Sequence, residues 1–224
     1  MKHLITLSLA FCSMAIAKAQ LPTTVPHSPT TISEYMGNGE IQVSISDDNP
    51  LSNNYNQSFE FYDENIEDTW VFEGYMIYQV RIPFPSLDFD NSNYFRLVAQ
   101  SDVTNGVNTL SNWSYDPFLQ ECVPAVEVEG ANTGLEFTYT FDTDAFTGLP
   151  FEEGEFYCYI SRSYATNANG SDGTCDEPST FIAGTANPSG ETQIICSTVA
   201  LGIEEHDIGN LTVLGAKEGG TVEI

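Results

Sequence analysis

WVFEGYMIYQVRI, residues 70–82, carries aromatic or β-branched side chains at most of its positions and no proline. Such side chains fit the pleated, half-buried surface of a β-sheet, so the stretch predicts one long strand. We expect this strand to be central in a β-sheet.

The runs on either side of this strand repeat its pattern. Apolar side chains occupy every second position of EIQVSIS, at Ile41, Val43 and Ile45, and of GLEFTYTF. Clusters of Gly, Pro, Asn and Asp separate the runs, and no window shows an apolar helical stripe. The sequence therefore predicts an all-β sandwich over residues 37–200, with strands at 40–46, 70–82, 94–100, 134–141, 155–165 and 192–199.

The first residues, MKHLITLSLAFCSMAIAKAQ, have the three parts of a secretory signal peptide. Lys2 is a positive start, Leu4–Ala17 is apolar, and Ala17-Lys18-Ala19 is a small-x-small cleavage site. We expect a signal peptide over residues 1–19, cleaved before Gln20. The apolar run is shorter than the roughly 20 residues of a membrane anchor. A lipid attachment site at Cys12 is the other alternative, and the bulky Phe11 before it argues against it.

Two segments flank the predicted sandwich. Residues 20–36 are rich in Pro, Thr and Ser and predict a flexible N-terminal arm. Residues 201–224 contain an acidic stretch, GIEEHD, followed by two short strand-like runs, and predict a linker with a partial hairpin.

Charge restricts the possible partners. Cleavage before Gln20 leaves Arg81, Arg96, Arg162 and Lys217 against 32 carboxylates, a net charge near −28. Nucleic acids and anionic membranes require Lys and Arg to neutralise phosphate, so the sequence predicts no nucleic-acid partner and no membrane insertion. The charge is explained either by solubility outside the cell or by the binding of a divalent cation.

Three stretches carry a resemblance to a known family: FEGYMIYQV, RLVAQSDVTNG and GEFYCYISRSYATN. They resemble the fibronectin type III-like module of large secreted proteins of the Bacteroidetes type, in which a Gly-Tyr-x-Ile/Val-Tyr strand comes third. The resemblance covers residues 37–199 and implies a fibronectin type III or immunoglobulin-like sandwich. The chain departs from the family at Ser46, where a core Trp is usual, and in an insertion at 102–134.

The last residues resemble a second family. LTVLGAKEGGTVEI, at Leu211–Ile224, is similar to the opening of a type IX secretion C-terminal sorting domain. The resemblance implies export through that machinery to the medium or the cell surface. Because only the first hairpin of such a domain is recognisable, periplasmic retention is the alternative location.

Four cysteines follow Gln20, and an even number in an exported chain predicts two disulfides. Cys158 lies near the start of the penultimate strand and Cys196 near the end of the last, and antiparallel pairing brings these ends together. Of the three possible connectivities we therefore expect Cys158–Cys196 and Cys122–Cys175. A zinc site is the rival interpretation, but no Cys-x-x-Cys spacing supports it.

The sequence offers little for catalysis. His27 and His206 are the only histidines after Gln20 and fall outside the predicted sandwich, so the expected protein is not an enzyme. Calcium is the one possible cofactor, because oxygen ligands alternate in DFDNSN, at Asp88, Asp90 and Asn93. A second such cluster is NANGSDG, with Asn167, Asn169 and Asp172.

Two aromatic residues of the insertion, Trp113 and Tyr115, are the predicted ligand-binding residues, whereas Trp70 is expected in the core. The sequence predicts a secreted, non-catalytic module that acts in adhesion or as a structural accessory domain. Its expected partners are the export machinery and an extracellular protein or glycan. The alternatives are a carbohydrate-binding module and the C-terminal remnant of a larger exported hydrolase.

Overall fold

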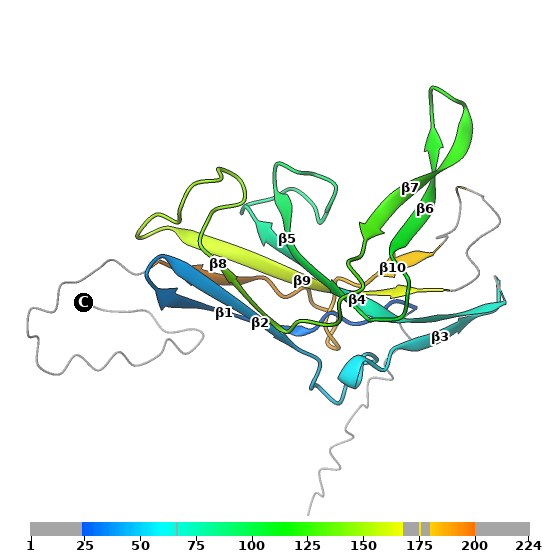
Figure 1. Ribbon diagram of the computed structural model, residues 1–224, viewed down its shortest axis with the longest axis horizontal. Coiled ribbons are helices and arrows are strands. Elements are labelled where there is room, and N and C mark those ends of the chain that lie inside the picture. Colours follow the sequence, from blue (N-terminus) through cyan, green and yellow to red (C-terminus); the bar gives the residue numbers. More distant parts are fainter. Residues whose placement is uncertain (1–23, 66, 168–174, 176–179, 200–224) are drawn as a thin grey trace, which may run out of the picture.

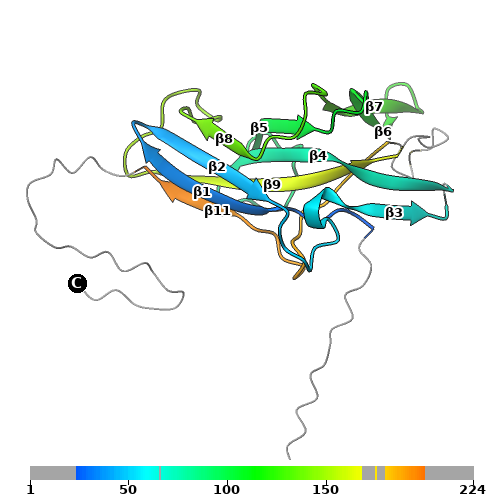
Figure 2. The same cartoon turned by 60° about the horizontal axis from the view of Figure 1, so that its bottom comes forward.

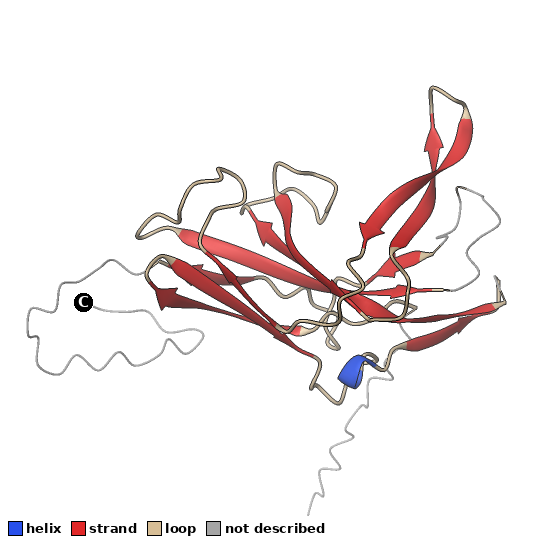
Figure 3. Cartoon of the chain, viewed as in Figure 1, coloured by secondary structure: helices blue, strands red, loops and turns tan. Residues whose placement is uncertain are grey.

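The structure, a computed structural model, describes residues 24–199 apart from 66, 168–174 and 176–179. The predictions for residues 1–19 and 201–224, and for Asn169 and Asp172, lie outside the described residues. The described chain is built from strands joined by loops, with one short 3₁₀ turn at Tyr55–Gln57 (Figure 3). The predicted all-β fold is confirmed. No helix in this part of the chain has the length and apolar character needed to cross a membrane.

The strands form one three-stranded sheet, one six-stranded sheet and a separate hairpin. The small sheet has the order β1-β2-β8, and the large sheet is built on the neighbouring strands β4 and β9. The strands are β1 Thr30–Gly37, β2 Glu40–Ser46, β3 Glu60–Asp63, β4 Asp68–Val80, β5 Phe95–Asp102, β6 Thr109–Asp116, β7 Glu121–Glu129, β8 Thr138–Phe141, β9 Phe156–Thr166, β10 Phe181–Ala183 and β11 Ile195–Thr198.

The two longest strands, β4 and β9, pair with each other, and each pairs with two shorter strands along its other edge. β4 pairs with β9 along one edge, and its other edge pairs with β3 over its first residues and with β5 from Gly74 onward. β9 pairs with β11 near its start and with β10 at its end. Figure 1 shows the same division: β3 and β10 lie toward one end of the central pair, and β11 lies toward the other.

The first core lies between the two sheets. Ile41, Val43 and Ile45 of β2 are buried, as their alternation predicts, and they pack with Tyr75 and Ile77 from the facing side of β4. Trp70 belongs to this core with 2% of its surface exposed, which confirms its predicted burial. In Figure 2, β1 and β2 lie beside β9 as a separate layer.

A second core covers the opposite face of the large sheet. Met76 and Tyr78 of β4 alternate with the residues of the first core and contact Phe95 and, from the base of the hairpin, Leu110 and Val128. β4 and β9 are therefore buried on both faces, which explains why their sequences are apolar at consecutive positions.

Strand β1 corrects the expectation of a flexible arm over residues 20–36. Thr30–Gly37 pairs antiparallel with β2, so the second half of the expected arm is part of the small sheet. Thr31 and Ser33 face inward together with Tyr35, and Thr31 is buried against Ser161, whereas Ile32 and Met36 are about half exposed. Because polar residues occupy part of the inward face, the composition of the segment resembled a linker.

Both predicted disulfides are present. Cys158 and Cys196 lie opposite each other in the β9–β11 pairing, with their Cα atoms 4.0 Å apart. Cys122 of β7 is bonded to Cys175, at a Cα separation of 5.6 Å, and ties the hairpin to the segment between β9 and β10. The first bond joins β9 to β11 near one end of the large sheet, and the second links the hairpin covalently to Cys175.

Candidate functional site

The predicted insertion at 102–134 contains the most exposed large apolar residue of the described chain, at the tip of a hairpin. β6 and β7 pair only with each other, and Figure 1 shows the hairpin projecting from the sandwich. Its base is held by Leu110 and Val128 in the second core. Thr180 adds backbone and hydroxyl hydrogen bonds of 2.8–3.0 Å to Ser111, so the hairpin leaves the body at a fixed place.

The two predicted ligand-binding residues lie on this hairpin but differ in exposure. Tyr115 is 59% exposed and lies opposite Cys122, whereas Trp113 is half-buried and lies opposite Pro124. The tip beyond them exposes two residues that sequence analysis missed, Phe118 at 94% and Leu119 at 61%.

Asp116 holds the tip in one conformation. Its Oδ1 accepts hydrogen bonds from the backbone N–H groups of Phe118, at 2.7 Å, and Leu119, at 3.1 Å, and its carbonyl accepts one from Gln120 at 2.8 Å. This Asx-type turn fixes the backbone while the Phe118 and Leu119 side chains point to solvent. Apolar side chains on a fixed turn can bind a partner without a large loss of conformational entropy.

Two acidic residues flank the exposed apolar tip. Asp116 and Glu121 form the last pair of the β6–β7 ladder before the turn, and no Lys or Arg occurs between Arg96 and Arg162 in the sequence. A surface of this charge favours a basic or neutral partner over an acidic one.

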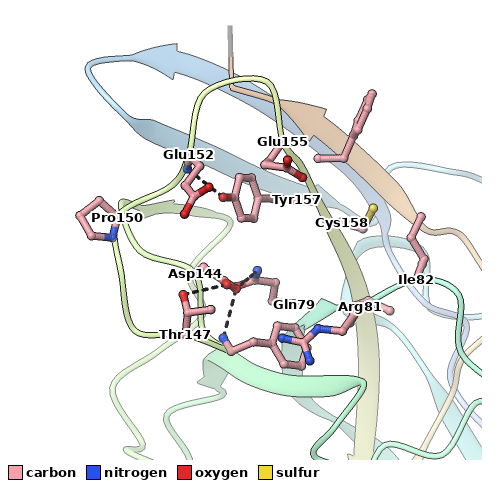
Figure 4. A pocket seen from close by; sticks show the side chains of 13 residues that line it. Gln79, Arg81, Ile82, Asp144, Thr147, Pro150, Glu152, Glu155, Tyr157 and Cys158 are labelled. Carbon is pink, nitrogen blue, oxygen red and sulfur yellow. Dashed lines mark hydrogen bonds between the residues drawn. The ribbon is translucent and has the colours of Figure 1, made fainter. Parts of the chain in front are cut away.

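A pocket of about 300 Å³ lies at the other end of the large sheet (Figure 4). The end of β4, the loop before β9 and the start of β9 line it. Gln79 donates a 2.7 Å hydrogen bond to Oδ1 of Asp144, and Thr147 donates one of 2.9 Å to Oδ2. The carboxylate of Asp144 therefore organises the pocket wall, and Figure 4 shows it at the centre of these bonds.

Two arginines stand near this pocket. The guanidinium carbon of Arg81 lies 4.3 Å from the centre of the Phe146 ring, and that of Arg96 lies 5.8 Å from it. Cys158 in the pocket wall is disulfide-bonded and is therefore not a free thiol. The polar side chains of the wall suit the binding of a polar molecule.

His27 is not in a linker, which corrects the prediction made for it. Only 4% of its surface is exposed, its backbone N–H donates to Oδ1 of Asn53 at 2.7 Å, and its imidazole Nδ1 accepts from the backbone N–H of Asn53 at 3.0 Å. Burial lowers the pKa of its imidazole. His27 therefore has a structural role, joining the segment before β1 to the loop after β2.

The predicted calcium ligands Asp88, Asp90 and Asn93 are exposed. Oδ1 of Asp88 accepts a hydrogen bond from the N–H of Asp90 at 3.3 Å, and Asn91 caps the next turn in the same way. Asn167 of the second candidate cluster is buried at the end of β9. Across the described ranges, no three His, Cys, Asp or Glu residues are gathered in a way that could hold a metal ion.

Comparisons with known proteins add no relative. A scan against protein-family models finds no match, and searches of the curated proteins and of the solved structures find none.

Proposed function

We propose that this chain is an exported, non-catalytic β-sandwich module that acts in adhesion, and that it binds through the tip of the β6–β7 hairpin. The observation that carries the proposal is the exposure of Phe118 and Leu119 on a turn held by Asp116. Export is supported by the two disulfides, which form and persist in oxidising compartments. Kinship with fibronectin type III-like modules and type IX secretion belongs to the same proposal.

The partner we propose is an extracellular protein with an apolar pocket bordered by basic residues. A single exposed Phe in the centre of a contact provides the apolar anchor that dominates many protein interfaces. The carboxylates of Asp116 and Glu121 on either side would meet Lys or Arg at the rim and increase the rate of association. A sugar is a poorer match, because Phe118 has no polar edge to bond its hydroxyl groups.

A peptide library displayed on phage tests this function. We expect selection on the full chain without residues 1–19 to enrich peptides that combine aromatic or aliphatic residues with Lys or Arg. The double substitution F118A/L119A should weaken the binding of a selected peptide at least tenfold. Leu51→Ala is the matched control, because Leu51 is also exposed, at 71%, but lies in the loop after β2.

A glycan array probed in parallel separates the alternative function. Binding to a glycan that is lost in W113A or Y115A, and kept in F118A/L119A, would support a carbohydrate-binding module instead. Peptide binding unaffected by F118A/L119A would contradict the proposed contact.

A further inference from the structure

Two carboxylates are enclosed where the base of the hairpin meets β4. Glu73 has 1% of its surface exposed and Asp102 has 2%. Both line a small space that is too narrow for a water molecule, together with Asn108, Gly130 and Tyr164. Neither residue belongs to the hairpin tip or to the pocket beside Cys158.

Each carboxylate is bonded through one oxygen only. Oε2 of Glu73 accepts a 2.7 Å hydrogen bond from the side-chain amide of Asn105. Oδ2 of Asp102 accepts a 2.9 Å bond from the backbone N–H of Asn132. Oε1 of Glu73 and Oδ1 of Asp102 are buried and receive no hydrogen bond from any described residue. Burying a carboxylate oxygen without a hydrogen-bond partner lowers the stability of the folded state. A native fold that buries two such oxygens therefore requires a ligand or a proton that offsets this loss of stability.

No arginine of the described chain compensates these charges. Arg81 and Arg96 stand over Phe146, and Arg162 stands over Phe89. Each carboxylate instead has the other as its charged neighbour. Burial, and then the charge of Asp102, raise the pKa of Glu73 to about 7, against a lowering by the hydrogen bond from Asn105.

The backbone around the carboxylates is shaped to bring them together. Glu73 is the extra residue of a β-bulge, since Phe72 pairs with Ala165 and Gly74 with Tyr164. A bulge redirects the side chain of the inserted residue and is frequent beside functional sites.

Two glycines permit this close packing. A Cβ at Gly130 would lie 2.0 Å from Oδ2 of Asp102, and one at Gly74 would lie 2.2 Å from the carbonyl oxygen of Ser101. Neither position can hold a larger residue without moving a carboxylate or a strand.

We propose that Glu73 and Asp102 form a buried site for one hard divalent cation, calcium. The two carboxylates supply a charge of −2 that one such ion neutralises, and their unpartnered oxygens are ligands of the kind that calcium prefers. Asn108 and the hydroxyl of Tyr164 offer neutral oxygens to complete the shell. The space holds no more than a small ion, which favours direct coordination over a hydrated ion.

The position of the site suggests that the ion would fix the hairpin to the central sheet. Glu73 lies in β4, Asp102 ends β5, and Asn108 precedes β6. An ion bound there would join the central sheet to the base of the hairpin and fix the direction in which the hairpin projects.

The test uses the full chain without residues 1–19, stripped with EDTA and titrated with CaCl₂ or MgCl₂ at constant ionic strength. We expect calcium to raise the thermal midpoint by several degrees and to bind with 1:1 stoichiometry by calorimetry, with at least tenfold weaker binding of magnesium. E73Q and D102N should each abolish the response. The control D88N/D90N, which removes the exposed acids of the 81–94 loop, should keep it. Terbium provides a second readout, because Tyr164 beside the site should sensitise its luminescence.

Two results would overturn the proposal. A midpoint insensitive to calcium and EDTA, together with a higher midpoint for E73Q, would mean that the two carboxylates share a proton. A calcium response lost in D88N/D90N and kept in E73Q would place the ion in the exposed loop.

Discussion

The hydroxyl of Tyr75 donates a 2.5 Å hydrogen bond to Oδ2 of Asp47, and both side chains are buried between the sheets. Asn54 donates a second bond of 2.7 Å to the same oxygen and a third, of 3.2 Å, to the hydroxyl of Ser163. This network connects the loop after β2 to β4 and β9, the two central strands. Its only ionisable member at neutral pH is Asp47.

We expect the protonation of Asp47 to stabilise the folded protein in mild acid. Burial raises the pKa of Asp47 to about 6, and the hydrogen bond from Tyr75 offsets only part of that effect. The folded state therefore binds the proton more tightly than the unfolded state. This contribution is complete below pH 4 and is lost as the pH rises through 6, by roughly 2–3 kcal/mol.

The variant Asp47→Asn isolates this contribution from the other acids. Because only the wild type loses this contribution, the stability of the variant relative to the wild type should increase by that amount between pH 4 and pH 7, measured by urea denaturation at each pH. A constant difference across this range would show that Asp47 has an ordinary pKa. Asp48→Asn, next to it and more exposed, serves as the control.

The two disulfides should differ in importance. Their closed loops span 38 and 53 residues, for which loop entropy predicts a similar stabilisation of roughly 4 kcal/mol each. Cys158 is also part of the second core, so C158A/C196A leaves a cavity there, whereas Cys122 is half-buried on the hairpin. We expect C158A/C196A to unfold at lower urea concentration than C122A/C175A. The reverse order would mean that the hairpin supports the core more than its contacts suggest.

Gly184→Ala should detach the segment before β1. An added Cβ would lie 1.7 Å from the carbonyl oxygen of Pro26, so the segment must move, at a cost of roughly 1–3 kcal/mol. We expect faster hydrogen exchange at the amide of Ser28, which donates to the carbonyl of Ala186 at 2.9 Å. Gly148→Ala is the control: its φ of +70° strains the backbone, but no atom lies within 4 Å, so exchange at Ser28 should not change.

The two tryptophans should be separable by fluorescence. Trp113→Phe leaves only Trp70, which is buried, and its emission should be blue-shifted and protected from acrylamide. Trp70→Phe leaves only Trp113, which should emit further to the red and be quenched several-fold more efficiently. Equal quenching of the two variants would contradict the difference in burial.

The long strands could be predicted from the sequence because they have regular apolar patterns. In some of them both faces are apolar, and in others one face is apolar in strict alternation. β2, β4 and β9 are of this kind, and the expected ranges match them within three residues. β1 could not be found in this way, since Thr31 and Ser33 point inward and form hydroxyl pairs with Ser161 and Ser197. Periodicity detects apolar faces and does not detect a polar seam between two sheets.

The candidate sites were harder to predict for a related reason. Trp113 and Tyr115 drew attention as aromatic residues in a polar stretch, but the exposure of Phe118 depends on the turn that Asp116 holds. The carboxylates Glu73 and Asp102 are separated by 29 positions in the sequence, and the pairing of β4 with β5 brings them together. Among 32 acids, sequence alone gave no reason to single out these two.

The bond between Cys122 and Cys175 also determines how the hairpin would respond to a pulling force. Cys122 lies one pair from the end of the β6–β7 ladder, opposite Tyr115. Tension applied at Phe118 would therefore leave the tip by three covalent routes, the backbones of β6 and β7 and the disulfide to Cys175. If the load pulled Leu110 and Val128 out of the second core, the hairpin would still be tied to the chain at a point near its tip as well as at its base.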